Sequence, residues 1–92
     1  MVAIRVIKCD DYYIHVGLMD GRSVNIPLFW YPRLYDATPE QRERVEISPF
    51  GLHWEEIDED ISIEGLLAGK MDNTRQGRAR RAEIEAAMKA AE

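Results

Sequence analysis

The sequence predicts a small α+β domain: an antiparallel β-meander sheet with short helices packed on one face, plus a C-terminal helix. Apolar and polar residues alternate along the first third of the chain, and loops rich in Asp and Gly separate these segments. An Ala- and Arg-rich stretch ends the chain and favours helix. The 92 residues suffice for one such domain with a thin core.

The first 27 residues are predicted to form three consecutive strands. The apolar face of the first strand would be formed by Val2, Ile4 and Val6. The second strand covers residues 12–18, where apolar side chains occupy every other position. Asp20-Gly21 then predicts a type I′ hairpin turn, in which both central residues take positive φ. The return strand is expected to end at Pro27.

Capping residues predict the short helices that follow the meander. Thr38 is a predicted N-cap, with Pro39 at the first helical position and Gln41 completing a capping box. Ser62 is expected to cap the last helix of the body, and Gly69 to end it. Further short strands are expected at residues 45–47 and 52–54.

The chain divides into a body at residues 1–69 and a helical extension at residues 70–92. From Arg75 onward, Ala, Arg and Glu dominate, and Ile84 and Met88 form a thin apolar stripe. Such a stripe is too narrow for the helix to be stable alone in water. The helix would therefore dock on the body, dock on a partner or second copy of the chain, or stay frayed.

Charge is unevenly distributed along the chain. The formal net charge is −5, and residues 1–69 hold six Lys and Arg against thirteen Asp and Glu. Residues 70–92 hold six basic residues against four acidic ones. An acidic body repels the phosphates of nucleic acids and attracts basic proteins. We therefore expect a basic partner and no direct nucleic-acid binding.

Cysteine content and the N-terminal sequence indicate a cytoplasmic protein. Cys9 is the only cysteine, so no internal disulfide can form, and its side chain is expected to pack inside the fold. Met1 leads directly into an alternating strand pattern, without the apolar run of a signal peptide. The apolar runs are far shorter than a membrane span, so no membrane association is expected.

Several short motifs in the body occur in the order seen in a known protein family. The matching segments are Asp20-Gly21-Arg22, Pro32-Arg33-Leu34, Ala37-Thr38, Gly51, His53-Trp54, Ile57 to Ile61, and Gly65-Leu66-Leu67. Through these residues the chain resembles the bacterial domain of unknown function 2442 over about residues 1–69. The extension from Lys70 onward lies outside the resemblance.

The resemblance implies a small α+β unit with an antiparallel sheet and no established enzymatic activity. It also implies that some members are encoded beside another small protein, in an arrangement like that of toxin–antitoxin pairs. Some members of the family carry an added helix-turn-helix. This chain departs from them, because its C-terminal extension has room for one helix only.

A dense run of carboxylates between Glu55 and Glu64, here called the acidic face, is the main candidate site. Aromatic side chains and Arg33 are expected nearby, because Tyr, Trp and Arg are enriched at protein interfaces. Arg33 would otherwise pair with a body carboxylate, and Trp54 is expected in the core. The predicted partner-binding residues are Tyr31, Arg33, Tyr35, Glu55, Glu56, Asp58, Glu59, Asp60, Ile84 and Met88.

His53 with Asp58 or Asp60 offers a different chemistry. Imidazole and carboxylates are suitable metal ligands and acid–base groups, but their spacing matches no known metal-binding loop. Asp58 and Asp60 would otherwise cap backbone amides ahead of the last helix of the body. No cofactor is expected, because no phosphate-binding or catalytic motif is present.

Three functions remain open from the sequence. The leading hypothesis is a non-enzymatic protein-interaction module, in its most concrete form an antitoxin-like protein that binds a small basic partner encoded by an adjacent gene. A second is a small metal-dependent or hydrolytic enzyme that uses His53. A third is an acidic mimic of nucleic acid that blocks a basic groove.

Overall fold

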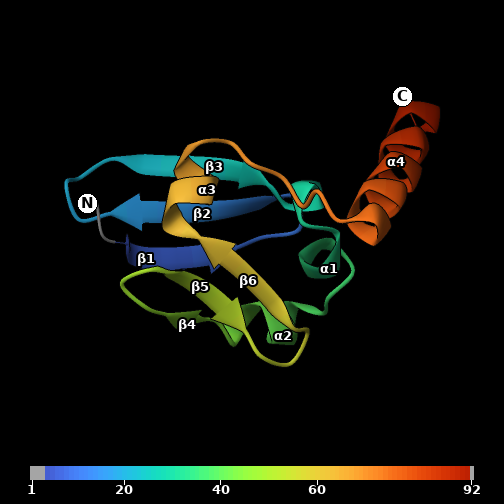
Figure 1. Ribbon diagram of the computed structural model, residues 1–92. Coiled ribbons are helices and arrows are strands. Elements are labelled where there is room, and N and C mark those ends of the chain that lie inside the picture. Colours follow the sequence, from blue (N-terminus) through green and yellow to red (C-terminus); the bar gives the residue numbers. More distant parts are fainter. Residues whose placement is uncertain (1–3, 92) are drawn as a thin grey trace.

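A computed structural model describes residues 4–91 of the chain (Figure 1). Within this range the strands form two antiparallel sheets of three strands each. The first sheet contains β1 (Ile4–Cys9), β2 (Tyr13–Leu18) and β3 (Ser23–Pro27). The second contains β4 (Glu46–Ile47), β5 (Gly51–Trp54) and β6 (Glu59–Ser62). The predicted α+β class with a C-terminal helix is confirmed, and the later strands form a sheet of their own.

The first sheet follows the predicted meander, with the strand order β1-β2-β3. In β2 the alternation is confirmed, because Ile14, Val16 and Leu18 are buried while Tyr13 is exposed. These side chains form one side of the core together with Ile26 from β3. The opposite face of this sheet carries polar side chains, as expected for an antiparallel sheet with one solvated face.

The predicted apolar face of β1 is wrong in part. The register with β2 shifts between Ile4 and Val6, which indicates a β-bulge. Beyond this shift Ile7 and Cys9 pack against the core, while Val6 is 48% exposed. A local insertion reverses which side chains face inward, and strict alternation cannot reveal it. Val2 lies outside the described residues.

The turn between β2 and β3 is not the predicted type I′. Gly21 has a positive φ of 93°, but among the described non-glycine residues only Asp58 does, so Asp20 does not. The amide of Gly21 donates to the Leu18 carbonyl (3.1 Å), and the amide of Leu18 donates to Arg22 (2.8 Å). These bonds define a three-residue loop, in which a single left-handed residue is enough.

Short helices follow the first sheet and cover the end of the core. They are η1 (Leu28–Trp30), α1 (Pro32–Tyr35) and α2 (Pro39–Glu43). The predicted capping box of α2 is confirmed: the Gln41 amide donates to Thr38 Oγ1 (3.1 Å), and the Thr38 amide donates to Gln41 Oε1 (2.9 Å). Leu28 and Leu34 are fully buried.

The second sheet supplies the other side of the core. Leu52 and Trp54 of β5 and Ile61 of β6 point inward, and Trp54 is fully buried as predicted. Strand β6 was not predicted, because acidic residues are rare in strands and here Glu59 holds an inward-facing position. The expected helix after β6 is α3 (Ile63–Leu67), which Ser62 caps as predicted.

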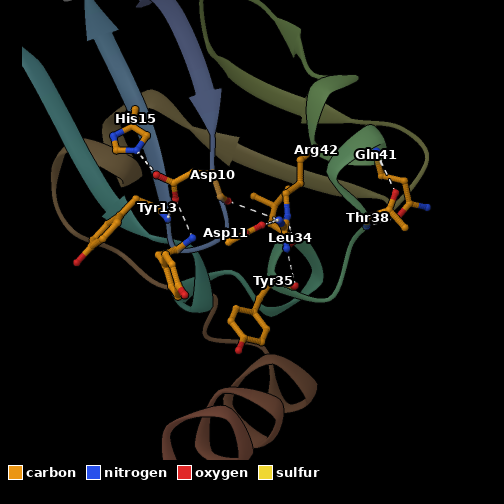
Figure 2. Close-up of polar contacts among 10 residues, drawn as sticks. Asp10, Asp11, Tyr13, His15, Leu34, Tyr35, Thr38, Gln41 and Arg42 are labelled. Atoms are coloured by element: carbon orange, nitrogen blue, oxygen red, sulfur yellow. Dashed lines mark hydrogen bonds and ion pairs between the residues drawn. The ribbon is translucent and has the colours of Figure 1, made fainter. Parts of the chain in front are cut away.

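The guanidinium of Arg42 connects the helices with the first sheet (Figure 2). Its Nε donates to the carbonyl of Leu34 and its Nη2 to that of Tyr35, both at 2.8 Å. Both carbonyls lie at the C-terminal end of α1, and that of Leu34 also accepts from the Ala37 amide (3.2 Å). Nη1 lies 3.5 Å from the Asp10 carbonyl oxygen and 3.8 Å from Asp11 Oδ1. Only 10% of the Arg42 side chain is exposed.

The same residue also contacts the second sheet. The carbonyl of Arg42 accepts a hydrogen bond of 3.0 Å from the indole Nε1 of Trp54. A buried indole N–H needs such an acceptor. Arg42 therefore links β1, α1 and β5 through its side chain and its backbone.

The extension forms α4 (Arg75–Ala90), which packs against η1 and α1 (Figure 1). Ile84 is buried, and Arg80 donates two hydrogen bonds to Asp36, of 2.9 and 2.8 Å. Gly77 packs so closely against Asp72 that a Cβ atom added to Gly77 would lie 2.4 Å from the carboxyl carbon of Asp72. The helix is thus docked on the body, and its C-terminal end points away from the sheets.

Replacing Arg42 by Met should lower the free energy of unfolding by about 3 kcal/mol, because two charge-assisted hydrogen bonds are lost and the Tyr35 carbonyl loses its donor. Arg44→Met is the matched control. Arg44 is exposed and pairs with Glu56 (2.7 Å), so its loss should cost less than about 1 kcal/mol. Chemical denaturation measures both, and equal losses would show that Arg42 has no special role.

Replacing Ile84 by Ala should destabilise the docked helix by about 2 kcal/mol, because it removes a buried side chain. Met88→Ala serves as the control, since Met88 is 38% exposed and its loss should cost about 0.5 kcal/mol or less. Hydrogen exchange of the α4 amides measures the effect. Unchanged protection in the Ile84 variant would contradict docking through this residue.

Candidate functional site

A groove of about 390 Å³ lies between strand β6 and the segment that joins α3 to α4. We call it the acidic groove. Its lining residues are Tyr31, Arg33, Asp58, Glu59, Asp60, Ile61, Ser62, Gly65, Lys70, Met71, Asp72 and Thr74. The groove therefore contains three of the predicted acidic residues together with a segment that the sequence analysis did not assign to a site.

Glu59 is the most unusual residue of the acidic groove. It stands opposite Trp54 in the second sheet and faces the same side as Ile61, so its side chain is only 6% exposed. Its Oε2 is buried and has no hydrogen-bond partner among the described residues. Burial, together with the nearby Asp72, raises the pKa of Glu59 to about 7, and Arg33 opposes both.

The turn before β6 sets the position of Glu59. Residues 55–58 connect β5 to β6, and the Asp58 amide donates to the Glu55 carbonyl at 3.2 Å. Asp58 has a φ of 51°, a left-handed conformation that short polar residues adopt more readily than others. The carbonyl of Asp58 accepts a hydrogen bond from Arg33 Nη1. Arg33 thus contacts the backbone of an acidic residue, and the predicted pairing with a carboxylate is wrong.

The opposite wall of the groove is held by backbone contacts. The Tyr31 hydroxyl donates to the carbonyl of Lys70 (2.6 Å), and burial raises the pKa of Tyr31 to about 12. The amide of Asp72 donates to the Trp30 carbonyl (3.1 Å). The Asp72 carboxylate accepts bonds from the Thr74 amide (3.0 Å) and hydroxyl (2.7 Å). These contacts hold both walls in place.

The groove carries more acidic than basic side chains. Among its described lining residues, the acidic ones are Asp58, Glu59, Asp60 and Asp72, and the basic ones are Arg33 and Lys70. With Glu59 ionised, the lining is net negative. Such a site favours a cation over an anion.

Several residues predicted to contact a partner are not exposed. Tyr31 is 5% exposed, Glu59 is 6% exposed and Ile84 is 3% exposed, so their side chains do not form an outward surface. Tyr31 and Ile84 are buried because they hold the segment after α3 and helix α4 in place. Tyr35 is half-buried against the core.

The other predicted residues are exposed but scattered. Glu55 and Glu56 lie in the turn before β6, where Glu56 pairs with Arg44. Asp58 and Asp60 are exposed at the groove, and Met88 is exposed near the end of α4. The acidic face is therefore divided between the turn, the outer face of β6 and the groove.

His53 and Asp60 come together on the outer face of the second sheet. The ring Nδ1 of His53 lies 2.6 Å from Asp60 Oδ1, which raises the pKa of His53. Asp58 is not part of this pair. It lies in the turn before β6, where its carbonyl accepts a hydrogen bond from Arg33. The predicted capping role of both aspartates is also wrong, because Ser62 Oγ accepts from the Gly65 amide (2.9 Å) at the start of α3.

The pair shares a shallow hollow with Ser48. Ser48, beside it, accepts bonds from the amides of Phe50 and Gly51, both at 3.2 Å, and so shapes its own turn. Among residues 4–91, no group of three or more His, Cys, Asp or Glu side chains is placed to hold a metal ion. His15 forms a similar exposed pair with Asp10 (2.7 Å), which lowers the pKa of Asp10 to about 2.

The segment that closes the groove was not predicted to belong to a site. Lys70, Met71, Asp72 and Thr74 were assigned only to the extension at residues 70–92. The signal was present in Asp72-Asn73-Thr74, because Asp followed two residues later by Thr favours a local turn that ends in a helix cap. The position of this turn against β6 depends on tertiary contacts.

The fold and the groove define a small α+β domain with an acidic, concave surface. None of the helices in the part of the chain that the structure describes has the length and apolar character to cross a membrane. The chain belongs to the family described as protein of unknown function DUF2442, whose model matches residues 3–72. The match ends before α4, as the sequence resemblance indicated.

Solved structures with the same fold come from bacteria. A crystal structure of a protein of unknown function from Rhodospirillum rubrum is 30% identical, with a TM-score of 0.69 over 83% of this chain and 95% of that one. A solution NMR structure of an uncharacterized protein from Chromobacterium violaceum is 28% identical, with a TM-score of 0.66 over 79% of this chain and 71% of that one. No curated protein matches this chain.

Glu59 should make stability depend on pH. Its pKa is raised from 4.5 to about 7, so the folded state binds more protons than the unfolded state within that window. The free energy of unfolding should therefore fall as pH rises through it, by about 3 kcal/mol in total from this group. Glu59→Gln should remove this contribution and be more stable than the wild type at pH 8.

Chemical denaturation across this pH range measures the difference between the two proteins. Glu64→Gln is the matched control, because Glu64 is exposed in the first turn of α3. Its difference from the wild type should vary little with pH. A Glu59→Gln curve parallel to that of the wild type would show that this carboxyl titrates normally.

Proposed function

We propose that this domain is a non-enzymatic protein-interaction module that binds a basic partner protein through the acidic groove and the turn beside it. The observation that supports this proposal is Glu59, a buried carboxyl without a partner for Oε2 at the wall of a net-negative groove. Asp58 and Asp60 add exposed charge at the rim.

The prearranged groove suits the binding of a partner. Both of its walls are held by hydrogen bonds from Tyr31, Arg33 and Thr74, so little ordering is needed when a partner binds. The negative lining would attract basic proteins and accelerate their encounter. An acidic mimic of nucleic acid would use the same charges, and competition by DNA for the bound partner would distinguish that case.

In its most specific form, the module is an antitoxin-like protein of the cytoplasm. This version rests on the arrangement with a neighbouring small protein that the family resemblance implies. The partner would then be the product of the adjacent gene, and its basic surface would occupy the groove. Helix α4 donates a hydrogen bond to the carbonyl of Asp72 and therefore lies beside the groove. Its exposed side chains would extend the contact with the partner.

An enzyme that uses the His53–Asp60 pair is the second candidate. The 2.6 Å contact between their side chains favours it, since such a pair can move a proton. Elemental analysis of the purified protein and assays with simple ester substrates test this candidate. A stoichiometric metal, or turnover lost in His53→Gln, would favour the enzyme over the interaction module.

Co-expression with the protein of the adjacent gene tests the interaction. The wild-type chain should co-elute with this protein at low salt, and Asp58→Lys/Asp60→Lys should elute separately, because charge reversal at the rim repels a basic partner. We expect affinity to fall by at least about tenfold, which corresponds to about 1.4 kcal/mol.

Glu40→Lys/Glu85→Lys is the matched control for this experiment. It makes the same change in net charge at exposed positions outside the groove, on α2 and α4. It should still co-elute with the partner. Separate elution of the wild type would refute the antitoxin-like version, and equal effects of both variants would show that only net charge matters.

A further inference from the structure

Glu59 lacks what a structural buried acid normally has. Buried carboxylates are paired or fully hydrogen-bonded, because their transfer from water is otherwise unfavourable. The Tyr31 hydroxyl, which is close enough to influence Glu59, donates instead to the carbonyl of Lys70. Arg33, the nearest base, donates to the carbonyl of Asp58. The donors of the described residues near Glu59 thus bind other acceptors.

The space in front of Glu59 suits a single long side chain. A volume of about 390 Å³ lies at the lower end of ligand pockets. Ile61 and Met71 provide apolar lining for an aliphatic stem, while Asp72 lies opposite as a second carboxylate. Arg and Lys side chains combine such a stem with a charged end.

We propose that the acidic groove receives one cationic side chain of the partner, an arginine or lysine, whose guanidinium or ammonium group donates to Glu59. This inference rests on the proposed function and specifies its contact. Asp72 lies on the far side of the same groove and strengthens its attraction for a cation. An anion is disfavoured, because acidic lining residues outnumber Arg33 and Lys70.

Titration of the ¹⁵N-labelled full chain with L-argininamide tests this inference by NMR. Saturable shifts are expected at groove amides such as those of Ile61, Met71 and Thr74. L-Citrullinamide, in which an uncharged urea of the same shape replaces the guanidinium, should cause none of them. Glu59→Gln should weaken argininamide binding by at least about tenfold, whereas Glu64→Gln should change it by less than about twofold.

A second variant separates loss of the site from loss of the fold. Met71→Trp leaves all charges in place and fills the groove from the opposite wall. It should lose argininamide binding as Glu59→Gln does. Binding by Met71→Trp at the wild-type level, or shifts that are equal in the Glu59 and Glu64 variants, would overturn the inference.

A peptide rich in arginine and lysine distinguishes failure of this inference from failure of the proposed function. If the peptide binds the wild type and Glu59→Gln equally, the acidic surface binds basic partners without the specific contact at Glu59. If neither the peptide nor argininamide binds the wild type, both proposals fail. Peptide binding that weakens in Glu59→Gln and Met71→Trp alike supports both.

Discussion

The buried guanidinium of Arg42 is the contact on which the arrangement of the body depends. Burying this group is unfavourable unless its donors find acceptors, and the acceptors here are the carbonyls of Leu34 and Tyr35 at the end of α1. The last carbonyls of a helix lack a full set of partners within it, and the guanidinium supplies a donor to each of these two. Because the Arg42 carbonyl also accepts from Trp54, the helices are joined to both sheets at one position.

The acidic groove follows from the way the second sheet completes the core. Ile61 and Glu59 occupy successive inward positions of β6, but Ile61 belongs to the apolar core whereas Glu59 lines the groove. The segment after α3 then returns across this position, held by Tyr31 and Asp72. The result is a carboxyl that is buried by tertiary packing and yet lines a surface groove.

Local patterns in the sequence predicted those features that depend on neighbouring residues. The capping box at Thr38 and the cap at Ser62 are correct, because each is a hydrogen bond between residues three apart. The alternation in β2 is also correct. The bulge near Val6 was not predicted, because it depends on the pairing of β1 with β2. The strand at Glu59 was not predicted, because tertiary packing, and not local sequence, explains an acidic residue at that position.

The sequence by itself determined the α+β class, the positions of most strands and caps, the helix at the C-terminus and the acidic character of the body. These follow from periodicity, turn chemistry and composition, which act over a few residues. Only the tertiary structure decided that Glu59 and Ile84 are buried, that His53 meets Asp60 but not Asp58, and that the segment near Asp72 closes a groove. Burial and charge proximity depend on which distant segments pack together, and no local pattern encodes that choice.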